Sequence, residues 1–455
     1  MIGLREADGV KADEANAWLI KLQRIEARSQ AYPQEVFNNI FHIIGIDMLR
    51  TLYFEMPSDK AIGVDRVSKN DYGLNLDENL TLLVTRIKRG TYKPKPARLV
   101  EIPKEDGSTR PLAISCFEDK LVQEAVNKIL NKIYEPLFLD SSYGFRPNRS
   151  PHLALQRLSE ESFKLKEGAI VEIDLRKCFN MIPHDHLHTF LEEKISDRRF
   201  LRLVNALVKT PVHTKEGLLP SDLGCPQGSI ISPILANVYL HHVIDKWFEA
   251  INVSHLKGQG KAIRFADDAV FVFHSKTEAE KFAKALPKRL AKYGLELNEA
   301  KSGILPAGSF LIQKMIHSGV KPPTFKFLGF VCYWGLSKSG KFYRLKFKSR
   351  SDRLQKKING LKKHLKENRN TPDTGKFLDN IKRVVVGWMN YHSISDNIHQ
   401  VRLFDNLTRR CLFKWFKRRS QRSKMTFEKL SKTLNERRYP VCKIRVQMYP
   451  TPASK

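Results

Sequence analysis

Residues 262–273 read AIRFADDAVFVF, and this stretch decides what kind of fold the chain adopts. Two runs of β-branched and aromatic residues flank an Asp-Asp pair, a pattern that predicts two strands joined by a tight turn. A second apolar run, AIVEID at residues 169–174, predicts a buried strand that ends in Asp174. If this strand and the hairpin share one sheet, Asp174, Asp267 and Asp268 lie together at one sheet edge.

Three carboxylates at one sheet edge predict a cation site, because unpaired buried carboxylates are costly. Hard oxygen ligands suit Mg²⁺, which takes phosphate oxygens as its remaining ligands. Two such ions about 3.5–4 Å apart can activate a hydroxyl nucleophile and stabilise a leaving phosphate. Side chains alternate along a strand, so Asp267 and Asp268 cannot be equivalent ligands unless the turn redirects one of them. We expect Asp174 and Asp267 as the principal metal ligands and Asp268 as a further one. The alternative for an isolated Asp-Asp pair is a surface turn.

The segments before these strands predict helices and a further hairpin. Residues 76–90 have the spacing of an amphipathic helix that ends at Gly90, a natural C-cap. Residues 97–114 contain two β-rich runs around Glu105-Asp106-Gly107, which predicts a hairpin. The helix predicted next has one apolar face, formed by Val122, Ala125, Val126, Ile129, Leu130 and Ile133.

The last quarter of the chain predicts strongly basic helices. The whole chain has a formal net charge of +31, and about 32 Lys and Arg against about 8 Asp and Glu lie in residues 336–455. Such an excess indicates a polyanionic partner, with a solvated basic surface as the alternative. An apolar stripe within these helices is expected to be core, and consists of Val401, Phe404, Leu407, Cys411, Leu412 and Trp415.

Several classes of protein are excluded by what the sequence lacks. The six cysteines contain no C-x-x-C pair, so neither a zinc site nor a disulfide framework is predicted. The first residues, MIGLREADGVKADE, lack the apolar run of a signal peptide, and no stretch approaches ~18 uncharged apolar residues. We therefore expect a reducing, cytoplasmic setting and no membrane partner.

Ordered sequence blocks resemble the reverse transcriptases encoded by bacterial group II introns. The blocks are SYGFRPNRS at 142–150, DLRKCF at 174–179, GCPQGSIISP at 224–233 and FADD at 265–268. Their order and spacing are also similar to those of the family, and the likeness runs from about residue 35 to about residue 400. Two departures are Phe265, where Tyr is commoner, and Asn180, where many relatives carry Asp.

The resemblance implies roles for five residues around the incoming nucleotide. Lys104 and Arg110 match the pair that grips the triphosphate, where cationic donors spread its developing charge. Phe179 matches the aromatic gate that leaves no room for a 2′-hydroxyl, and Gln227 matches a contact to nucleotide and template. Lys301 matches a lysine near the leaving pyrophosphate. The alternatives are that Lys104 and Arg110 are only exposed charges of the hairpin, that Phe179 only packs in the core, and that Lys301 is only a solvated lysine.

The resemblance also implies an α+β, right-hand polymerase architecture. We expect an N-terminal helical extension at 1–75, fingers and palm with an antiparallel sheet and helices at 76–335, and a basic helical thumb at 336–455. Residues 387–391, GWMNY, resemble the thumb or maturase X region of intron-encoded enzymes. Phosphate contacts to RNA are expected from the helix that carries Lys414, Lys417, Arg418 and Arg419.

The implied activity is RNA-directed DNA synthesis with two Mg²⁺ ions and deoxynucleoside triphosphates. Its partners would be an RNA template, a DNA or RNA primer and a partner RNA. If that partner RNA is an intron, the protein could also assist its splicing. No Cys- and His-rich nuclease module follows, so self-sufficient DNA cleavage is not expected. Rivals are an RNA-dependent RNA polymerase, which usually has a polar residue where Phe179 lies, and a pure splicing factor, which needs no carboxylates. Two biological roles are compatible with this chemistry: the mobility of an intron, or an antiphage defence in which the enzyme copies a dedicated non-coding RNA.

Overall fold

The computed structural model describes residues 3–103, 107, 109–214, 217–257, 260–420 and 422–449, with side chains from residue 17 onward. The chain forms two compact units. The first contains Met1–Arg149, Ile173–Ala269 and Glu280–Gly303, and the second contains Ser150–Glu172, Val270–Ala279 and Ile304–Lys455. The division expected from the sequence, at residues 75 and 335, stays a prediction.

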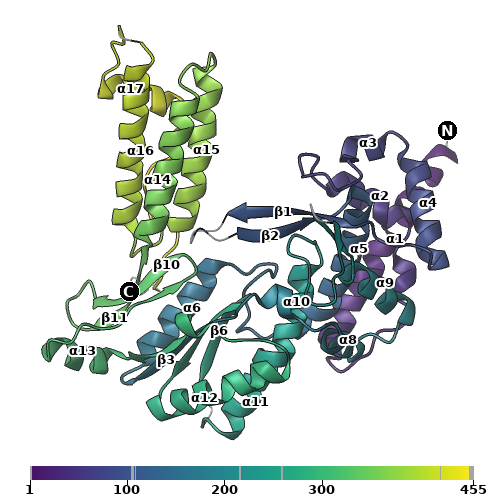
Figure 1. Ribbon diagram of the computed structural model, residues 1–455, viewed down its shortest axis with the longest axis horizontal. Helices are drawn as coiled ribbons and strands as arrows, with labels where there is room; N and C mark the ends of the chain where they lie inside the picture. The colour runs from purple at the N-terminus through teal and green to yellow at the C-terminus, as the bar shows by residue number, and fades with distance from the viewer. Residues whose placement is uncertain are drawn as a thin grey trace. The chain divides into compact units, whose positions relative to one another are not determined.

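Helices dominate the beginning of the first unit (Figure 1). Helix α1 (Gly3–Ala31) and helix α2 (Ile46–Glu55) pack on helix α5 (Phe117–Tyr134), and α3 (Lys69–Gly73) contacts α4 (Leu76–Arg89). The prediction of one buried face on α5 is confirmed, because each of these side chains is fully buried: Val122, Ala125, Val126, Ile129, Leu130 and Ile133.

The predicted helix end and the two paired strands of the first predicted hairpin are also confirmed, while Glu105 and Asp106 of its predicted turn lie outside the described residues. Gly90 caps α4 with φ 72°, a left-handed conformation that glycine adopts without steric cost. Strands β1 (Ala97–Pro103) and β2 (Thr109–Ile114) pair antiparallel, with Arg98 opposite Ile114. The sheet continues in the order β2-β1-β4-β5 through β4 (Val212–Thr214) and β5 (Gly217–Leu219).

A four-stranded sheet carries the predicted acidic residues. Its order is β6-β7-β3-β8, with β6 (Lys261–Phe265), β7 (Asp268–Phe273), β3 (Gly168–Asp174) and β8 (Gly303–Ala307). Because β7 lies between β6 and β3 in this order, the hairpin and the strand that ends in Asp174 share one sheet, as the sequence predicted.

Helices connect these strands, and one of them contains an irregular turn. Helix α10 (Ser232–Leu240) continues through a π-helical segment, η3 (His241–Asp245), into α11 (Lys246–Ser254). Further helices before strand β8 are α6 (Pro151–Lys164), α7 (Cys178–Met181), α8 (His184–Glu192), α9 (Arg198–Val208) and α12 (Lys276–Lys292), with short 3₁₀ turns η1 (Phe41–Ile43), η2 (Glu135–Leu137) and η4 (Glu299–Lys301).

The second unit contains a three-stranded antiparallel sheet with order β11-β10-β9. Its strands are β9 (Phe325–Phe327), β10 (Phe330–Leu336) and β11 (Tyr343–Ser349), and helices α6 and α13 (Ser309–His317) contact β11. The turn between β9 and β10 has positive φ at Leu328 (45°) and Gly329 (77°). Strand β11 follows residue 336, so the helices of the basic region begin later than the sequence pattern indicated.

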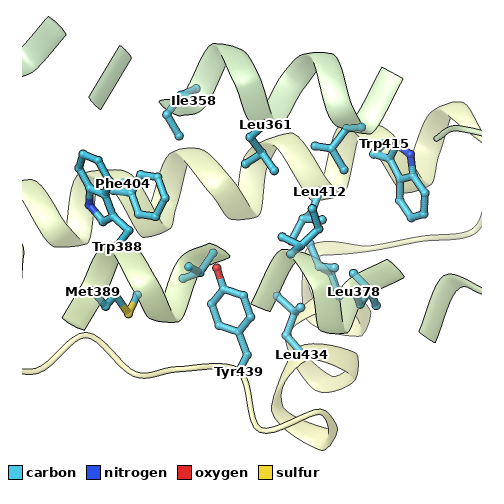
Figure 2. Close-up of a cluster of buried hydrophobic side chains, with 14 of the residues drawn as sticks. Ile358, Leu361, Leu378, Trp388, Met389, Phe404, Leu412, Trp415, Leu434 and Tyr439 are labelled. Carbon is cyan, nitrogen blue, oxygen red and sulfur yellow. The ribbon is translucent and has the colours of Figure 1, made fainter. Parts of the chain in front are cut away.

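Helices α14 (Ser351–Glu367), α15 (Thr374–His392), α16 (Ile398–Arg418) and α17 (Phe427–Glu436) form a bundle with an apolar core. Four residues of the expected stripe on α16 are confirmed as core, because Val401, Phe404 and Leu412 are almost fully buried and Trp415 is 4% exposed. Leu407 and Cys411 are partly buried and pack against this core. Figure 2 shows Phe404 beside Trp388 of α15, and it also labels Leu412 and Trp415 of this stripe. Within the described residues, no helix is both long and apolar enough to cross a bilayer.

Candidate active site

A strained turn presents the Asp-Asp pair. Ala266 has φ 57°, which is left-handed and disfavoured for a residue with a Cβ. Asp267 follows it in the turn, and Asp268 is the first residue of β7. Both side chains are half-buried. The turn thus breaks the strict alternation of a strand, so the two neighbouring carboxylates need not face opposite sides of the sheet.

Asp174 ends β3, and residues that follow α12 hold its carboxylate. The Asn298 side-chain amide donates to Asp174 Oδ2 at 2.7 Å, and the Asn298 backbone N–H donates to the Asp174 carbonyl at 2.8 Å. Lys301 Nζ lies 3.7 Å from the same Oδ2. The structure therefore brings the predicted Lys301 beside the predicted Asp174, and it adds Asn298, which the sequence argument did not single out.

The three carboxylates interact electrostatically. Burial raises the pKa of Asp267, and the charge of Asp174 raises it further. Burial also raises the pKa of Asp268 to about 7, with additional contributions from the charges of Asp267 and Asp174. Lys301 opposes this rise. Like charges close together in a half-buried site have this effect on pKa values, so the three acids form one site.

A hard cation fits this set of donors. The raised pKa values of Asp267 and Asp268 show that the carboxylates are not fully compensated by protein groups. In the described part of the chain, no group of three or more Asp, Glu, His or Cys side chains is placed so that it could hold a metal ion as it stands. The fit is therefore one of donor chemistry, because carboxylate oxygens are the ligands that a hard cation such as Mg²⁺ prefers.

The first hairpin contributes one of its two predicted cations. Arg110 on β2 is exposed, and its charge opposes the rise in the pKa of Asp267. Arg110 lies opposite Ile102 on β1. The structure thus brings Arg110 within electrostatic range of the acids. Lys104 lies outside the described residues.

Phe179 lies on α7, where its half-buried ring contacts another aromatic side chain. It meets Phe145 edge to face, with ring centroids 6.3 Å apart, and Phe145 is 54% exposed. The Phe179 carbonyl accepts from the Cys225 N–H at 2.7 Å. A Cβ on Gly224, which has φ 83°, would come within 2.7 Å of the same carbonyl. The predicted Gly-rich block at 224–233 therefore lies directly against the predicted gate.

Gln227 belongs to the same block and lines a cavity. Its carbonyl accepts from the Ala113 N–H of β2 at 2.6 Å, which fixes the block against the first hairpin. Residues of strands β1, β2, β4 and β5, together with residues 220–221 and 223–227, line a cavity of ≈ 290 Å³ that is open on one side. Within the described structure, Gln227 Oε1 is buried and accepts no hydrogen bond. Gln227 and Asn180 both line this cavity.

The sequence argument missed a buried ion pair behind the acidic turn. Arg264, one residue before Phe265, is 1% exposed and lies 2.6 Å from Asp245 of η3. An arginine inside an apolar strand pattern was the available signal, because arginine is almost never fully buried unless it is paired. Its partner, 19 residues earlier on a helix, could not be read from the pattern.

The predicted RNA-contacting residues lie at the end of α16 in the bundle. Lys414, Lys417 and Arg418 are exposed. Arg419 instead stacks over the Trp415 ring at 4.8 Å and donates to the Thr371 carbonyl at 2.9 Å. Three of these cations are thus exposed, although Lys417 Nζ also lies 5.2 Å from the centre of the Phe413 ring, whereas Arg419 stabilises the bundle.

Carboxylates at the edge of an antiparallel sheet, with a basic helical bundle later in the chain, are the features of a right-hand nucleic acid polymerase. Residues 102–332, about half the chain, match the family Reverse transcriptase (RNA-dependent DNA polymerase). Residues 352–434 match the Group II intron, maturase-specific domain. The chain belongs to the reverse transcriptase family and carries the maturase-specific domain of group II intron proteins.

Similar proteins include several encoded by introns. The Group II intron-encoded protein LtrA of Lactococcus lactis subsp. cremoris is 36% identical over 230 residues, 50% of this chain and 38% of that protein. An Uncharacterized 91 kDa protein in cob intron of Schizosaccharomyces pombe is 35% identical over 237 residues, 51% of this chain and 29% of that protein. The chain thus spans well under half of these relatives.

Among solved structures, telomerase from Candida albicans, in complex with a TWJ fragment of telomeric RNA, is similar over 82% of this chain and 69% of that chain. The TM-score is 0.43 and the sequence identity is 14%.

Proposed function

We propose that this protein is an RNA-directed DNA polymerase that copies RNA into cDNA by metal-dependent nucleotidyl transfer. The observation that carries the proposal is the electrostatic coupling of Asp174, Asp267 and Asp268, with Lys301 and Arg110 beside them. Family membership supports the choice of template and product, since the matched family is described as RNA-dependent DNA polymerase. The family match disfavours an RNA polymerase. The interacting carboxylates disfavour a purely RNA-binding splicing factor, which would not need them.

Asp174 and Asp267 would hold the metal, and Asp268 would complete or tune the site. Reverse transcriptases use divalent metal ions, and we propose two Mg²⁺ ions, which activate the primer 3′-hydroxyl and stabilise the leaving pyrophosphate when bound. Asn298 fixes the Asp174 carboxylate through its 2.7 Å hydrogen bond. Lys301, 3.7 Å from Asp174, can approach pyrophosphate oxygens and neutralise the charge that develops there.

The nucleotide would be bound between the first hairpin and the block at 224–233. Arg110 lies on this hairpin near the acids and would contact the triphosphate, together with Lys104. The half-buried ring of Phe179 would close the space beside the 2′ position, supported edge to face by Phe145. Gln227 Oε1, which has no partner among the described residues, would accept a hydrogen bond from nucleotide or template.

The partner RNA is proposed to be an intron RNA, and a splicing role would then accompany synthesis. The maturase-specific match covers residues 352–434, and the similar proteins above are described as intron-encoded or in an intron. No observation favours the antiphage alternative over this one. The cytoplasmic location expected from the sequence stays a prediction.

The test is primer extension on a defined RNA template with the full-length protein. We expect cDNA synthesis that requires Mg²⁺ and prefers deoxynucleoside over ribonucleoside triphosphates. Asp267→Asn, which keeps the size of the side chain, is the matched control and should be inactive. Efficient incorporation of ribonucleotides, or extension without a divalent ion, would overturn the proposal. RNA binding with no synthesis under any metal would support the splicing-factor alternative instead.

A further inference from the structure

The buried guanidinium of Arg264 uses every one of its donors. Nε donates to Asp245 Oδ1 at 2.7 Å, and Nη2 donates to Asp245 Oδ2 at 2.6 Å and to Ser142 Oγ at 2.8 Å. Nη1 donates to Asn237 Oδ1 at 3.2 Å and to the Ala266 carbonyl at 3.1 Å. Five N–H groups thus meet five acceptors, a set that the three donors of lysine cannot reproduce.

The acceptors come together because of the irregular helix turn. In a regular α-helix, residues seven apart lie on the same face. Segment η3 is π-helical and adds one residue per turn, so Asn237 and Asp245, eight apart, can both face Arg264. Asp245 is fully buried, and although burial would raise the pKa of its carboxyl, the Arg264 charge holds it below its usual value. The pair therefore stays ionised.

The same network surrounds the turn that carries Asp267. The Arg264 backbone N–H donates to the Ser141 carbonyl at 2.8 Å, and the Arg264 carbonyl accepts from the Tyr143 N–H at 2.8 Å, at the start of the block at 142–150. Asn237 Nδ2 donates to the Gly144 carbonyl at 2.7 Å, and a Cβ on Gly144 would collide with the Ala266 backbone nitrogen. The turn is thus held by Arg264 on one side and by the backbone of Gly144 on the other. Such support is needed because the φ of 57° at Ala266 is disfavoured for a residue with a Cβ.

We propose that Arg264 is a positioning residue, whose bond to the Ala266 carbonyl keeps this turn left-handed and so holds Asp267 beside Asp174. This inference rests on the proposed polymerase function. Asp245 binds the Arg264 guanidinium on its other side, so that the cation is not drawn into an ion pair with the carboxylates of the site. The guanidinium acts on the reaction through backbone geometry and makes no contact of its own with substrate.

The test measures single-nucleotide addition by full-length Arg264→Lys, which keeps the buried charge but loses donors. We expect kcat to fall about 100-fold, because a displacement near 1 Å at a reacting group has that effect, while the nucleotide KM and primer–template affinity stay within about threefold. Adding Ala266→Gly should recover at least about tenfold of the loss, because glycine adopts positive φ without help. A residue needed only for folding would not be rescued in this way.

Two further variants keep the test decisive. Arg344→Lys is the matched control, since Arg344 is also a buried arginine but pairs with Asp396 at 2.8 Å rather than with any residue of this network, and it should keep kcat within about threefold. If Arg264→Lys does not fold, Asp245→Glu preserves the ion pair while displacing the guanidinium, and the same loss and rescue are expected. A folded variant with wild-type kcat, or a loss that Ala266→Gly does not rescue, would overturn the inference. If the wild-type protein itself adds no nucleotide, the proposed function fails instead.

Discussion

The acidic site and the helical bundle of α14–α17 use charged residues in opposite ways. In the first, Arg264 and Asp245 are each 1% exposed as side chains and are almost surrounded by hydrogen-bond partners. In the bundle, the core is apolar and contains Trp388, Phe404 and Trp415, while lysines and arginines lie on the outside. Charge inside a fold is costly unless each group is paired, whereas charge on a helix surface needs no partner.

The difference teaches where a substitution should act. A change among the buried charges of the acidic site should alter geometry and chemistry, with little effect on long-range attraction to RNA. A change among the exposed cations of the bundle should alter RNA affinity and its salt dependence, with little effect on a nucleotide already bound. The predictions below test this division from the largest expected effect to the smallest.

Asp174→Asn and Asp267→Asn should each reduce Mg²⁺-dependent primer extension by at least about 10³-fold, or roughly 4 kcal/mol of transition-state stabilisation. RNA affinity should stay nearly unchanged, because the loss is confined to metal binding. Asp268→Asn should have a defect of smaller size. Asp77→Asn, at a side chain that is 79% exposed, is the control and should be fully active. Near-wild-type extension by either of the first two variants would contradict the assignment.

The bundle should show a pH dependence that originates from one histidine. His392 stacks on Trp388, and its Nδ1 lies 2.9 Å from Ser349 Oγ. Burial lowers the pKa of His392 to about 3. The unfolded chain therefore binds the proton on His392 more readily than the folded chain does. The contribution of His392 to folding stability is complete above pH about 6.5 and is lost as pH falls toward 3.

His392→Phe keeps a stacked ring and removes the titration, so its stability should vary less between these pH values. The difference from wild type is at most about 5 kcal/mol, since each pKa unit corresponds to about 1.4 kcal/mol. Urea unfolding followed by tryptophan fluorescence measures it, because Trp388 and Trp415 lie in this core. The exposed His255→Gln serves as the control. Equal pH profiles for His392→Phe and wild type would show that His392 titrates normally.

Phe179→Ala should relax sugar selection, because removal of the ring opens space beside the 2′ position. The ratio of kcat/KM for deoxyribonucleotide over ribonucleotide should fall about 10- to 100-fold, the range expected for a steric contact. Phe179→Tyr keeps the ring and should keep the ratio. An unchanged ratio in a folded, active Phe179→Ala protein would assign the ring to core packing alone.

Replacing Lys414, Lys417 and Arg418 together by Ala should weaken RNA binding and flatten its salt dependence. Each lost phosphate contact should reduce the log–log slope by about one unit, because fewer counterions are released. Arg419 is left unchanged, since its bond to Thr371 supports the bundle. A triple replacement of Lys281, Lys284 and Lys288 on α12 removes the same charge elsewhere and should change the slope less. Equal slopes for the two triple variants would show that the α16 cations are only a solvated surface.

Much of the local structure followed from the sequence pattern. The Asp-Asp hairpin, the Gly90 cap and the four core residues of the stripe on α16 depend on spacing within one segment, and all of them are confirmed. Strand β11 was not expected within the basic region, because its alternating pattern at Tyr343–Ser349 contains three basic residues that obscure it. The resemblance identified the catalytic family, which residues 102–332 then confirmed.

The sequence by itself determined which residues are acidic, where several of the strands and helices form, and that the basic charge is concentrated near the end of the chain. These properties depend on composition and on the periods of 2 and 3.6 residues, which are local. Only the tertiary structure decided that Asn298, 124 residues after Asp174, holds its carboxylate, and that Arg264 reaches Ser142, 122 residues away. It also decided that Arg419 supports the bundle. The reason is that a buried polar group takes whatever acceptor the packing of distant segments brings within hydrogen-bond distance, and no local pattern encodes that choice.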